Sequence, residues 1–304
     1  MKLSVIVPCH NAKETLPTAL RSIDIASEGL DVETVVIDDP EGRGPSWARN
    51  RGLDKAAGDV VFFVDADDTV KKDFFRRPLS VIERTGADIC FFTYSGGPKL
   101  DELVIDGVCA VRERFLPAFF GYSMDDVRRW NAGGSLYGSK EPGQVWRCAY
   151  RRDFLDRHAI RFDEAMTFYE DAAFLSSCAA FAERAATIPD ELYEYVPLPG
   201  GNLASGSGSR RHWEYKFLAL ESRKRLNAKS GGAVWPYCAA SCVFSAMEMM
   251  RLWKRAGLSP REAFADIRRY ISDRRVKEAL REFPLSRRHP LAAAAVLFLR
   301  FLSR

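Results

Sequence analysis

Residues 60–68 read VVFFVDADD, and this stretch decides the fold. Its apolar run is typical of a strand buried on both faces of a sheet, and Asp65, Asp67 and Asp68 follow the run directly. Similar strands are predicted at 3–7, 32–37 and 89–94, with helical patterns between them. This alternation predicts an α/β fold with a Rossmann-like, mostly parallel sheet and helices on both faces. Such sheets bind ligands beyond the carboxyl ends of their strands, where the acidic residues lie.

The helices between these strands are predicted from apolar residues at helical spacing. Asn11 is expected to cap the first helix, whose apolar positions run from Leu16 to Ile23. The next two helices are expected at 47–57 and 71–85, because each pattern stops at a glycine.

The composition is that of a folded chain without a nucleic-acid partner. Of 304 residues, 47% are hydrophobic and 28% charged, which argues against general disorder. Lys and Arg number 45 against 41 Asp and Glu, so the net charge of +4 is too balanced to indicate nucleic acid. The seven cysteines lack metal-type spacing, and polar residues soon interrupt the apolar start of the chain. We therefore expect a reduced, cytoplasmic protein without a signal peptide.

Two regions are expected along the chain. Residues 1–210 are predicted to form the α/β domain, and 211–304 a helical C-terminal region. Residues 233–250 are largely apolar but include proline, serine and glutamate, so a buried helix is expected there and not a membrane span. Residues 259–262, with Ser first and Glu last, have the form of a capping box.

The last helical pattern, 290–302, contains nine consecutive apolar residues at 291–299. Basic residues precede and follow it, so 287–304 could lie on an anionic membrane surface, at the inner face of the plasma membrane. Packing against its own domain, or against a second copy of the chain in a homodimer, would explain the pattern equally well.

The acidic cluster after residue 64 predicts a metal site. Three carboxylates within four residues repel one another unless a positive charge lies among them. Mg²⁺ or Mn²⁺, held by one or two carboxylates and by substrate phosphates, meets that need, and Asp65 and Asp67 are its expected ligands. The alternative is a solvated turn in which Asp68 caps the next helix.

Other polar residues are expected at the same edge of the sheet. Asp38 and Asp39 end the second strand, where a carboxylate could accept hydrogen bonds from a nucleobase or a ribose. Pro8, His10 and Asn11 join the first strand to the first helix, a place suited to nucleotide contact. Near the second helix, Arg49 and Arg51 could hold a diphosphate, and Asn50 between them is a further candidate. A turn former, an incidental loop histidine and a solvated helix face are the respective alternatives.

The order of these motifs is more specific than any one of them. SVIVPCHN (4–11), VIDD (36–39), ARNRGL (48–53) and FVDADD (63–68) follow one another, and VW (145–146), YRRDFL (150–155), IRF (160–162) and YEDAAF (169–174) come later. Together they resemble the family 2 glycosyltransferases of the GT-A fold, over about residues 3–95 and 144–200. The resemblance implies that 1–95 bind a nucleotide-sugar and that 96–210 supply the acceptor side and the catalytic base.

The resemblance also implies individual roles. Asp38 or Asp39 would contact the base and ribose of the donor, which is usually a UDP-sugar. Asp65 and Asp67 match the family's Asp-x-Asp motif, which holds the divalent metal on the diphosphate. Asp171 matches the catalytic base of inverting members, with Glu170 as its rival, and Trp146 matches an aromatic residue on the acceptor side.

The sequence departs from the family pattern at two places. Only residues 40–47 separate the Asp38-Asp39 strand from the Arg49 segment, so one element is shortened or lost. His10 stands where the family often has a tyrosine, which puts stacking on the base in doubt.

The expected activity is metal-dependent, inverting transfer of a sugar from a nucleotide diphosphate to a hydroxyl of a saccharide or lipid-linked acceptor. Synthesis of a cell-surface polysaccharide is a plausible setting. Two alternatives stay open: a nucleotidyltransferase, which would release pyrophosphate from a nucleoside triphosphate, and a non-catalytic protein of the same fold that binds nucleotides or carbohydrates.

Overall fold

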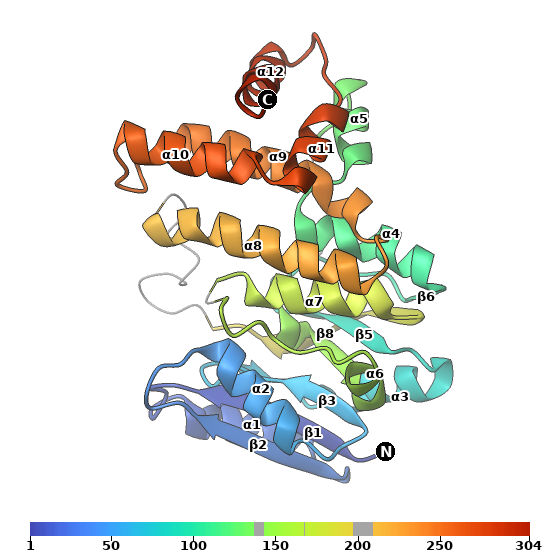
Figure 1. The fold of residues 1–304 in the computed structure, drawn as a ribbon. Helices are drawn as coiled ribbons and strands as arrows, with labels where there is room; N and C mark the ends of the chain where they lie inside the picture. The colour runs from blue at the N-terminus through green and yellow to red at the C-terminus, as the bar shows by residue number, and fades with distance from the viewer. Residues whose placement is uncertain (137–142, 167, 197–208) are drawn as a thin grey trace. The chain divides into compact units, whose positions relative to one another are not determined.

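A computed structural model describes residues 1–136, 143–166, 168–196 and 209–304 (Figure 1). The chain divides into two compact units. The first unit contains residues 1–112 and 143–200, and the second contains 113–142 and 201–304. The sequence analysis placed all of 96–210 in the α/β domain, whereas the structure groups 113–142 with the C-terminal helices.

The first unit is built on one mixed sheet. Its strands, in chain order, are β1 (Leu3–Cys9), β2 (Val32–Asp38), β3 (Val60–Phe63), β4 (Thr69–Val70), β5 (Ile89–Tyr94), β6 (Leu103–Asp106), β7 (Cys148–Arg151) and β8 (Arg184–Glu194). The spatial order is β2-β1-β3-β7-β5-β8-β4, and β6 pairs with β8. Strands β1, β2, β3, β5 and β8 run in one direction, and β4, β6 and β7 run in the other. The predicted α/β class, with its mostly parallel sheet, is confirmed.

Helices cover both faces of this sheet because side chains alternate along each strand. The helices of the unit are α1 (Leu16–Ala26), α2 (Pro45–Lys55), α3 (Arg76–Thr85), α6 (Arg152–Arg157) and α7 (Glu170–Phe181). Ile23 of α1 and Ile82 of α3 share one core cluster with Val5 and Phe62. On the other face Phe63 contacts Phe174 of α7, with ring centroids 5.9 Å apart.

Helix α2 lies unusually close to β1. A Cβ atom built on Gly52 would lie 2.2 Å from Cγ2 of Ile6, so glycine is needed for this contact. The close approach brings the residues that precede Gly52 in α2 near the carboxyl ends of the strands.

Two predicted helix starts are wrong. The first helix begins at Leu16 with Thr15 as its N-cap, and Asn11 instead adopts a left-handed conformation with φ of 53°. The third begins at Arg76 and not at residue 71, since residues 69–70 form strand β4 and residues 72–75 form a turn before the helix. Asp68 therefore precedes a strand and does not cap a helix.

The second unit is helical over its described residues. It includes α5 (Met124–Asn131), α8 (Arg210–Lys229), α9 (Trp235–Leu252), α10 (Pro260–Ile271), α11 (Arg274–Glu282) and α12 (Pro290–Leu302), and α4 (Val108–Phe120) runs into it from the first unit. Helix α9 is the predicted buried helix, and Ser259 forms the predicted capping box with Glu262. Among the described helices, none combines the length and the apolar character that crossing a membrane requires.

Candidate active site

A buried arginine joins three carboxylates that are far apart in the sequence. Arg49, on α2, is 4% exposed. Its Nη1 donates to Asp171 Oδ1 at 2.7 Å and to Glu170 Oε1 at 3.3 Å, and its Nη2 donates to Asp65 Oδ1 at 3.1 Å. We call these four residues the Arg49 cluster. The predicted metal ligand Asp65 and the predicted base Asp171 thus lie on opposite ends of one guanidinium.

The fold explains how these groups meet. Asp65 follows β3 at its carboxyl end, and Glu170 and Asp171 occupy the first turn of α7, as predicted. Negative charge in a first helical turn is favoured by the helix dipole. The Val145 N–H also donates to Asp171 Oδ2 at 3.3 Å, so both carboxylate oxygens of Asp171 are held.

The Arg49 cluster perturbs the charge of its members. Burial raises the pKa of Asp171, and the positive charge of Arg49 opposes that rise. Burial alone would lower the pKa of Arg49, but the three carboxylates outweigh burial and raise it, so Arg49 stays charged. A carboxylate with a raised pKa binds a proton more readily, which is the property required of a general base.

Tyr193 holds the turn that carries the acidic motif, a role that sequence reasoning missed. The Tyr193 hydroxyl accepts from the Asp65 N–H at 3.1 Å and donates to Asp68 Oδ2 at 2.7 Å. Asp68 is 1% exposed and also accepts from the Val196 N–H at 2.7 Å. Asp68 therefore fixes the turn, while Asp65 and Asp67 remain partly exposed.

The acidic edge fits a divalent cation that is shared with a phosphate. Burial and the charge of Asp65 raise the pKa of Asp67. Burial raises the pKa of Asp68 to about 7, against the hydrogen bonds from Val196 and Tyr193. Burial is the main cause of both pKa shifts, and the negative charge of the neighbouring aspartates adds to it. Within the described ranges, no three acidic, histidine or cysteine side chains form a metal-binding group on their own. The residues fit an ion held by Asp65 and Asp67 together with substrate phosphates.

Asp39 is the better placed of the two carboxylates predicted to meet the nucleotide. It is 2% exposed, and its Oδ2 accepts from the Gly44 N–H at 2.8 Å. Its Oδ1 is buried without a hydrogen-bond partner among the described residues. An unpaired buried oxygen is costly, so an N–H or O–H donor arriving there would gain a strong hydrogen bond. Asp38, by contrast, is exposed.

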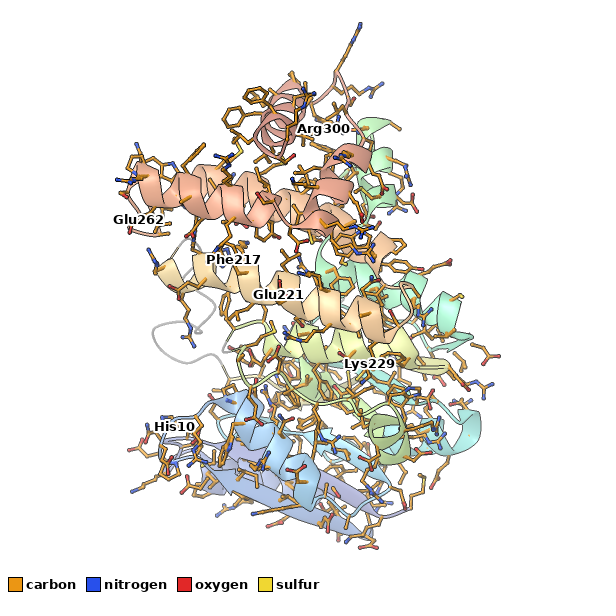
Figure 2. The ribbon with its side chains drawn as sticks, in the orientation of Figure 1. His10, Phe217, Glu221, Lys229, Glu262 and Arg300 are labelled. Atoms are coloured by element: carbon orange, nitrogen blue, oxygen red, sulfur yellow. The ribbon has the colours of Figure 1, made fainter. Side chains whose placement is uncertain are left out.

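The loop after β1 lies beside Asp39. His10, labelled in Figure 2, is exposed, and its Nδ1 lies 2.6 Å from the Asp39 carbonyl oxygen. Its Nε2 lies 2.8 Å from Asn11 Nδ2. Pro8 is half-buried and lies opposite Ile37 in the sheet register. These residues lie at the strand ends, as predicted. The His10 imidazole contacts the Asp39 carbonyl, and the Asn11 amide contacts the imidazole.

Two residues of α2 differ from their predicted roles. Arg49 was expected to hold a diphosphate, but its guanidinium is engaged by the three carboxylates of the cluster. Asn50 is 6% exposed and is used by the protein itself. Its Nδ2 donates to the Phe162 carbonyl at 3.0 Å, and its Oδ1 accepts from the Phe162 N–H at 2.9 Å. Asn50 therefore fixes the segment that leads to Glu170 and Asp171.

Trp146 packs behind the acidic turn. It is 4% exposed, and its ring stacks on Tyr193 with centroids 4.1 Å apart and planes 10° apart. Tyr94 meets it edge-on at 5.0 Å. In this structure the indole supports the tyrosine that holds Asp65 and Asp68, and it presents no open face to an acceptor.

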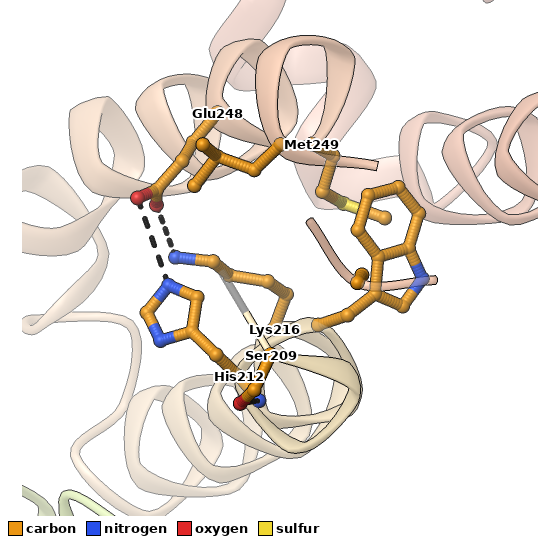
Figure 3. A pocket seen from close by; sticks show the side chains of 8 residues that line it. Ser209, His212, Lys216, Glu248 and Met249 are labelled. Carbon is orange, nitrogen blue, oxygen red and sulfur yellow. Dashed lines mark hydrogen bonds and ion pairs between the residues drawn. The ribbon is translucent and has the colours of Figure 1, made fainter. Parts of the chain in front are cut away.

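A second polar cluster lies inside the helical unit (Figure 3). Lys216 Nζ contacts Glu248 Oε2, and His212 Nε2 lies 3.6 Å from Glu248 Oε1. These side chains line a small hollow with an empty volume of about 190 Å³, which is below the usual range for ligand pockets. Glu248 balances the positive charge of Lys216, so the hollow does not attract an anion.

Residues 36–102, which include Asp39, the Arg49 segment and the acidic turn, match the model of the family described as "Glycosyl transferase family 2". The chain is similar to this family over that segment. The resemblance seen in the sequence is confirmed.

Curated relatives agree with this assignment. The chain is 27% identical over 241 residues to the succinoglycan biosynthesis protein ExoO of Rhizobium meliloti, covering 68% of this chain and 62% of that protein. It is 24% identical over 257 residues to the poly(ribitol-phosphate) beta-N-acetylglucosaminyltransferase TarS of Staphylococcus aureus, covering 75% of this chain and 41% of that protein. The chain thus spans less than two thirds of the length of these relatives.

Solved structures support the fold. The crystal structure of S. aureus TarS 1-349 in complex with UDP-GlcNAc matches with a TM-score of 0.52 at 17% identity, over 100% of this chain and 90% of that chain. The complex of the same protein with UDP matches with a TM-score of 0.53 at 16% identity. The family 2 fold predicted from the motifs, GT-A, is the fold observed.

Proposed function

We propose that the chain is an inverting, metal-dependent glycosyltransferase. It moves a sugar from a nucleotide diphosphate, with UDP as the expected nucleotide, to a hydroxyl of a saccharide or lipid-linked acceptor. The observation that supports this most directly is the Arg49 cluster, in which Asp65 of the acidic motif and Asp171 share one guanidinium. The proposed proton acceptor and the proposed metal ligand therefore lie close to each other.

Asp171 is the proposed general base. Its side chain is 20% exposed, so it can meet an acceptor hydroxyl, and two hydrogen bonds fix its orientation. It would take the proton as the hydroxyl oxygen attacks the anomeric carbon. If that attack comes from the side opposite the leaving diphosphate, the anomeric configuration inverts. Glu170, held by the same arginine at 3.3 Å, is the second candidate for this role.

Asp65 and Asp67 would hold Mn²⁺ or Mg²⁺, which when bound neutralises the charge that develops on the leaving diphosphate. Asp39 would receive a donor group of the base or ribose at its unpaired Oδ1. Arg49 would keep Asp65 and Asp171 apart at a fixed spacing. The names of the relatives, which include succinoglycan biosynthesis and an N-acetylglucosaminyltransferase, support polysaccharide synthesis as the setting.

A reducing compartment suits the chain. Its seven cysteines are all free thiols, and six of them are buried. We propose that it acts on the cytoplasmic side of the membrane, where thiols stay reduced.

The test measures transfer and binding separately. Asp171→Asn should lower kcat by about 10²–10⁴-fold, the usual contribution of a general base, while Mn²⁺-dependent binding of UDP is kept. Asp65→Asn and Asp67→Asn should weaken that binding, and EDTA should abolish it. Asp54→Asn, on the exposed side of α2, is the matched control and should change neither quantity.

Each alternative gives a distinct result. Release of UDP from a UDP-sugar supports the transferase, whereas release of pyrophosphate from a nucleoside triphosphate would identify a nucleotidyltransferase. Nucleotide binding without turnover on any donor would identify a binding protein. Full activity of Asp171→Asn and of Glu170→Gln would exclude both residues as the base.

A further inference from the structure

Helix α12 turns an apolar face to solvent. Leu291, Leu297, Phe298 and Phe301 are 87%, 52%, 49% and 67% exposed, and Ala294 is exposed beside them. A surface helix normally carries charged or polar residues on its outer face. A contiguous exposed apolar face of this kind marks an interaction site.

The opposite face of α12 anchors the helix to the second unit. Val296 and Leu299 are fully buried, and α12 packs against α9, α10 and α11. Arg300, labelled in Figure 2, donates from Nε to the Leu280 carbonyl at 2.6 Å and from Nη2 to the Phe283 carbonyl at 2.9 Å. Packing within the unit therefore accounts for one face of α12 and leaves the other uncovered.

Positive charge flanks the uncovered face. Arg287 and Arg288 precede α12 and Arg304 follows it, and all three are exposed. Residues 283–304 contain no Asp or Glu, and no carboxylate in the described part of the chain pairs with these three arginines.

The loop that carries Arg287 and Arg288 is itself held in place. The His289 ring stacks on Trp130 of α5 with centroids 3.5 Å apart. Asn131 Nδ2 donates to the Pro284 carbonyl at 2.9 Å. The two arginines are thus fixed near the start of α12 and do not belong to a detached tail.

We propose that the exposed face of α12 binds the surface of an anionic membrane. Leu297, Phe298 and Phe301 would enter the boundary between headgroups and acyl chains, while the flanking arginines contact lipid phosphates. With 13 residues, α12 is too short to span a bilayer and suits a helix lying in the interface.

Charge favours a membrane over a second copy of the chain. In a two-fold symmetric dimer the same patch faces itself, so the arginines of one copy would approach those of the other. No acidic residue in 283–304 could relieve that repulsion. A surface of anionic lipid supplies the opposite charge and an apolar layer together.

The experiment is co-sedimentation of the full chain with vesicles of phosphatidylcholine, alone or mixed with phosphatidylglycerol, at low and high salt. We expect binding to the mixed vesicles that weakens as salt rises. Leu297→Glu with Phe301→Glu should lower the partition coefficient at least about tenfold. Arg287→Gln with Arg288→Gln should lower it about tenfold at low salt, on mixed vesicles only.

Two matched controls test whether the loss of any exposed apolar or basic residue would lower vesicle binding. Phe264→Glu removes a phenylalanine of α10 that is 47% exposed, and Arg255→Gln removes an exposed arginine after α9. Both should leave binding unchanged. Thermal melts check the fold, and the arginine pair tests the proposal without altering α12.

Three results would overturn the proposal. The wild-type chain could fail to sediment with the mixed vesicles, or both double variants could bind as well as the wild type. The chain could also form a dimer, seen by light scattering, that Leu297→Glu with Phe301→Glu dissociates, without any vesicle binding. Vesicle binding is measured without substrate, so its outcome is independent of the proposed transferase activity.

Discussion

Replacing Arg49 by methionine should destabilise the first unit strongly. The substitution keeps much of the side-chain volume but removes the only positive charge that contacts Asp65, Glu170 and Asp171 among the described residues. The three carboxylates would then repel one another in a partly buried site.

The size of the loss follows from burial. Arg49 is 4% exposed, and removing one partner of a buried ion pair costs about 3–5 kcal/mol. The carboxylate side chains are 28%, 15% and 20% exposed, so water can solvate them in part. We therefore expect the lower end of that range, about 3 kcal/mol at neutral pH, which lowers Tm by about 6–12 °C for a domain of this size.

The effect should depend on pH with a definite sign. Without Arg49, the pKa values of the clustered carboxyl groups rise above those of the unfolded chain. The folded variant then binds protons more tightly than the unfolded variant, so its stability falls as the pH rises. The difference from wild type should be largest near pH 8 and should shrink toward pH 5.

Urea unfolding of wild type and variant across this pH range measures both quantities. Arg43→Met is the matched control, because Arg43 is 47% exposed and pairs with the exposed Glu41, a contact worth less than about 1 kcal/mol. Arg49→Lys keeps the positive charge but loses the forked geometry of the guanidinium. Its stability should therefore lie between that of the wild type and that of Arg49→Met. A loss below about 1 kcal/mol for Arg49→Met, or a loss that does not change with pH, would refute the reasoning.

Three further predictions concern residues of the first unit. Partial burial raises the pKa of Glu33, but hydrogen bonds from Lys2 and Ser4 lower it to about 2. Glu33 should therefore contribute about 1–2 kcal/mol above pH 4.5, lost as the pH falls toward 2, and Glu33→Gln should flatten that part of the acid-unfolding curve. Asn50→Ala should cost about 2 kcal/mol in urea unfolding, because the Phe162 backbone loses both partners; an unchanged midpoint would contradict this. Tyr193→Phe should weaken Mn²⁺-dependent UDP binding about tenfold in calorimetry, because the Asp65 turn loses its shared hydroxyl; wild-type affinity would show that the turn holds without it.

Much of the sheet could be predicted from the sequence, because strands such as β3 and β5 are runs of mostly apolar residues. The strands that were missed are short or depend on distant partners. Strand β7, at 148–151, has only four residues. It pairs with β3 and β5, and no local sequence pattern reveals that it lies between them. Strand β4 has two residues and exists only because β8 lies beside it.

The candidate site was also predicted only in part, because some of its features have a local sequence signal and others depend on residues far apart in the chain. Asp65 stood out because it directly follows a buried strand, and Asp171 because the residues around it resemble a motif of the family. The partners of Arg49 and Asn50 could not be read from the sequence, since Asp171 and Phe162 are 122 and 112 residues away. Residue type and position predicted the candidate groups, while the contacts that orient them required the fold.

The place of β7 has a consequence for how the protein is made on the ribosome. β7 is inserted between β3 and β5, so a nascent chain that ends near residue 112 holds β2, β1 and β3 on one side and β5 on the other, with nothing to join them. Synthesis must continue through 148–151 before the two pieces become one sheet, and through 194 before β8 can pair with β5, β4 and β6. Residues 1–112 should thus emerge as an unfinished, chaperone-dependent intermediate, and a gene fragment ending near residue 112 should yield insoluble product.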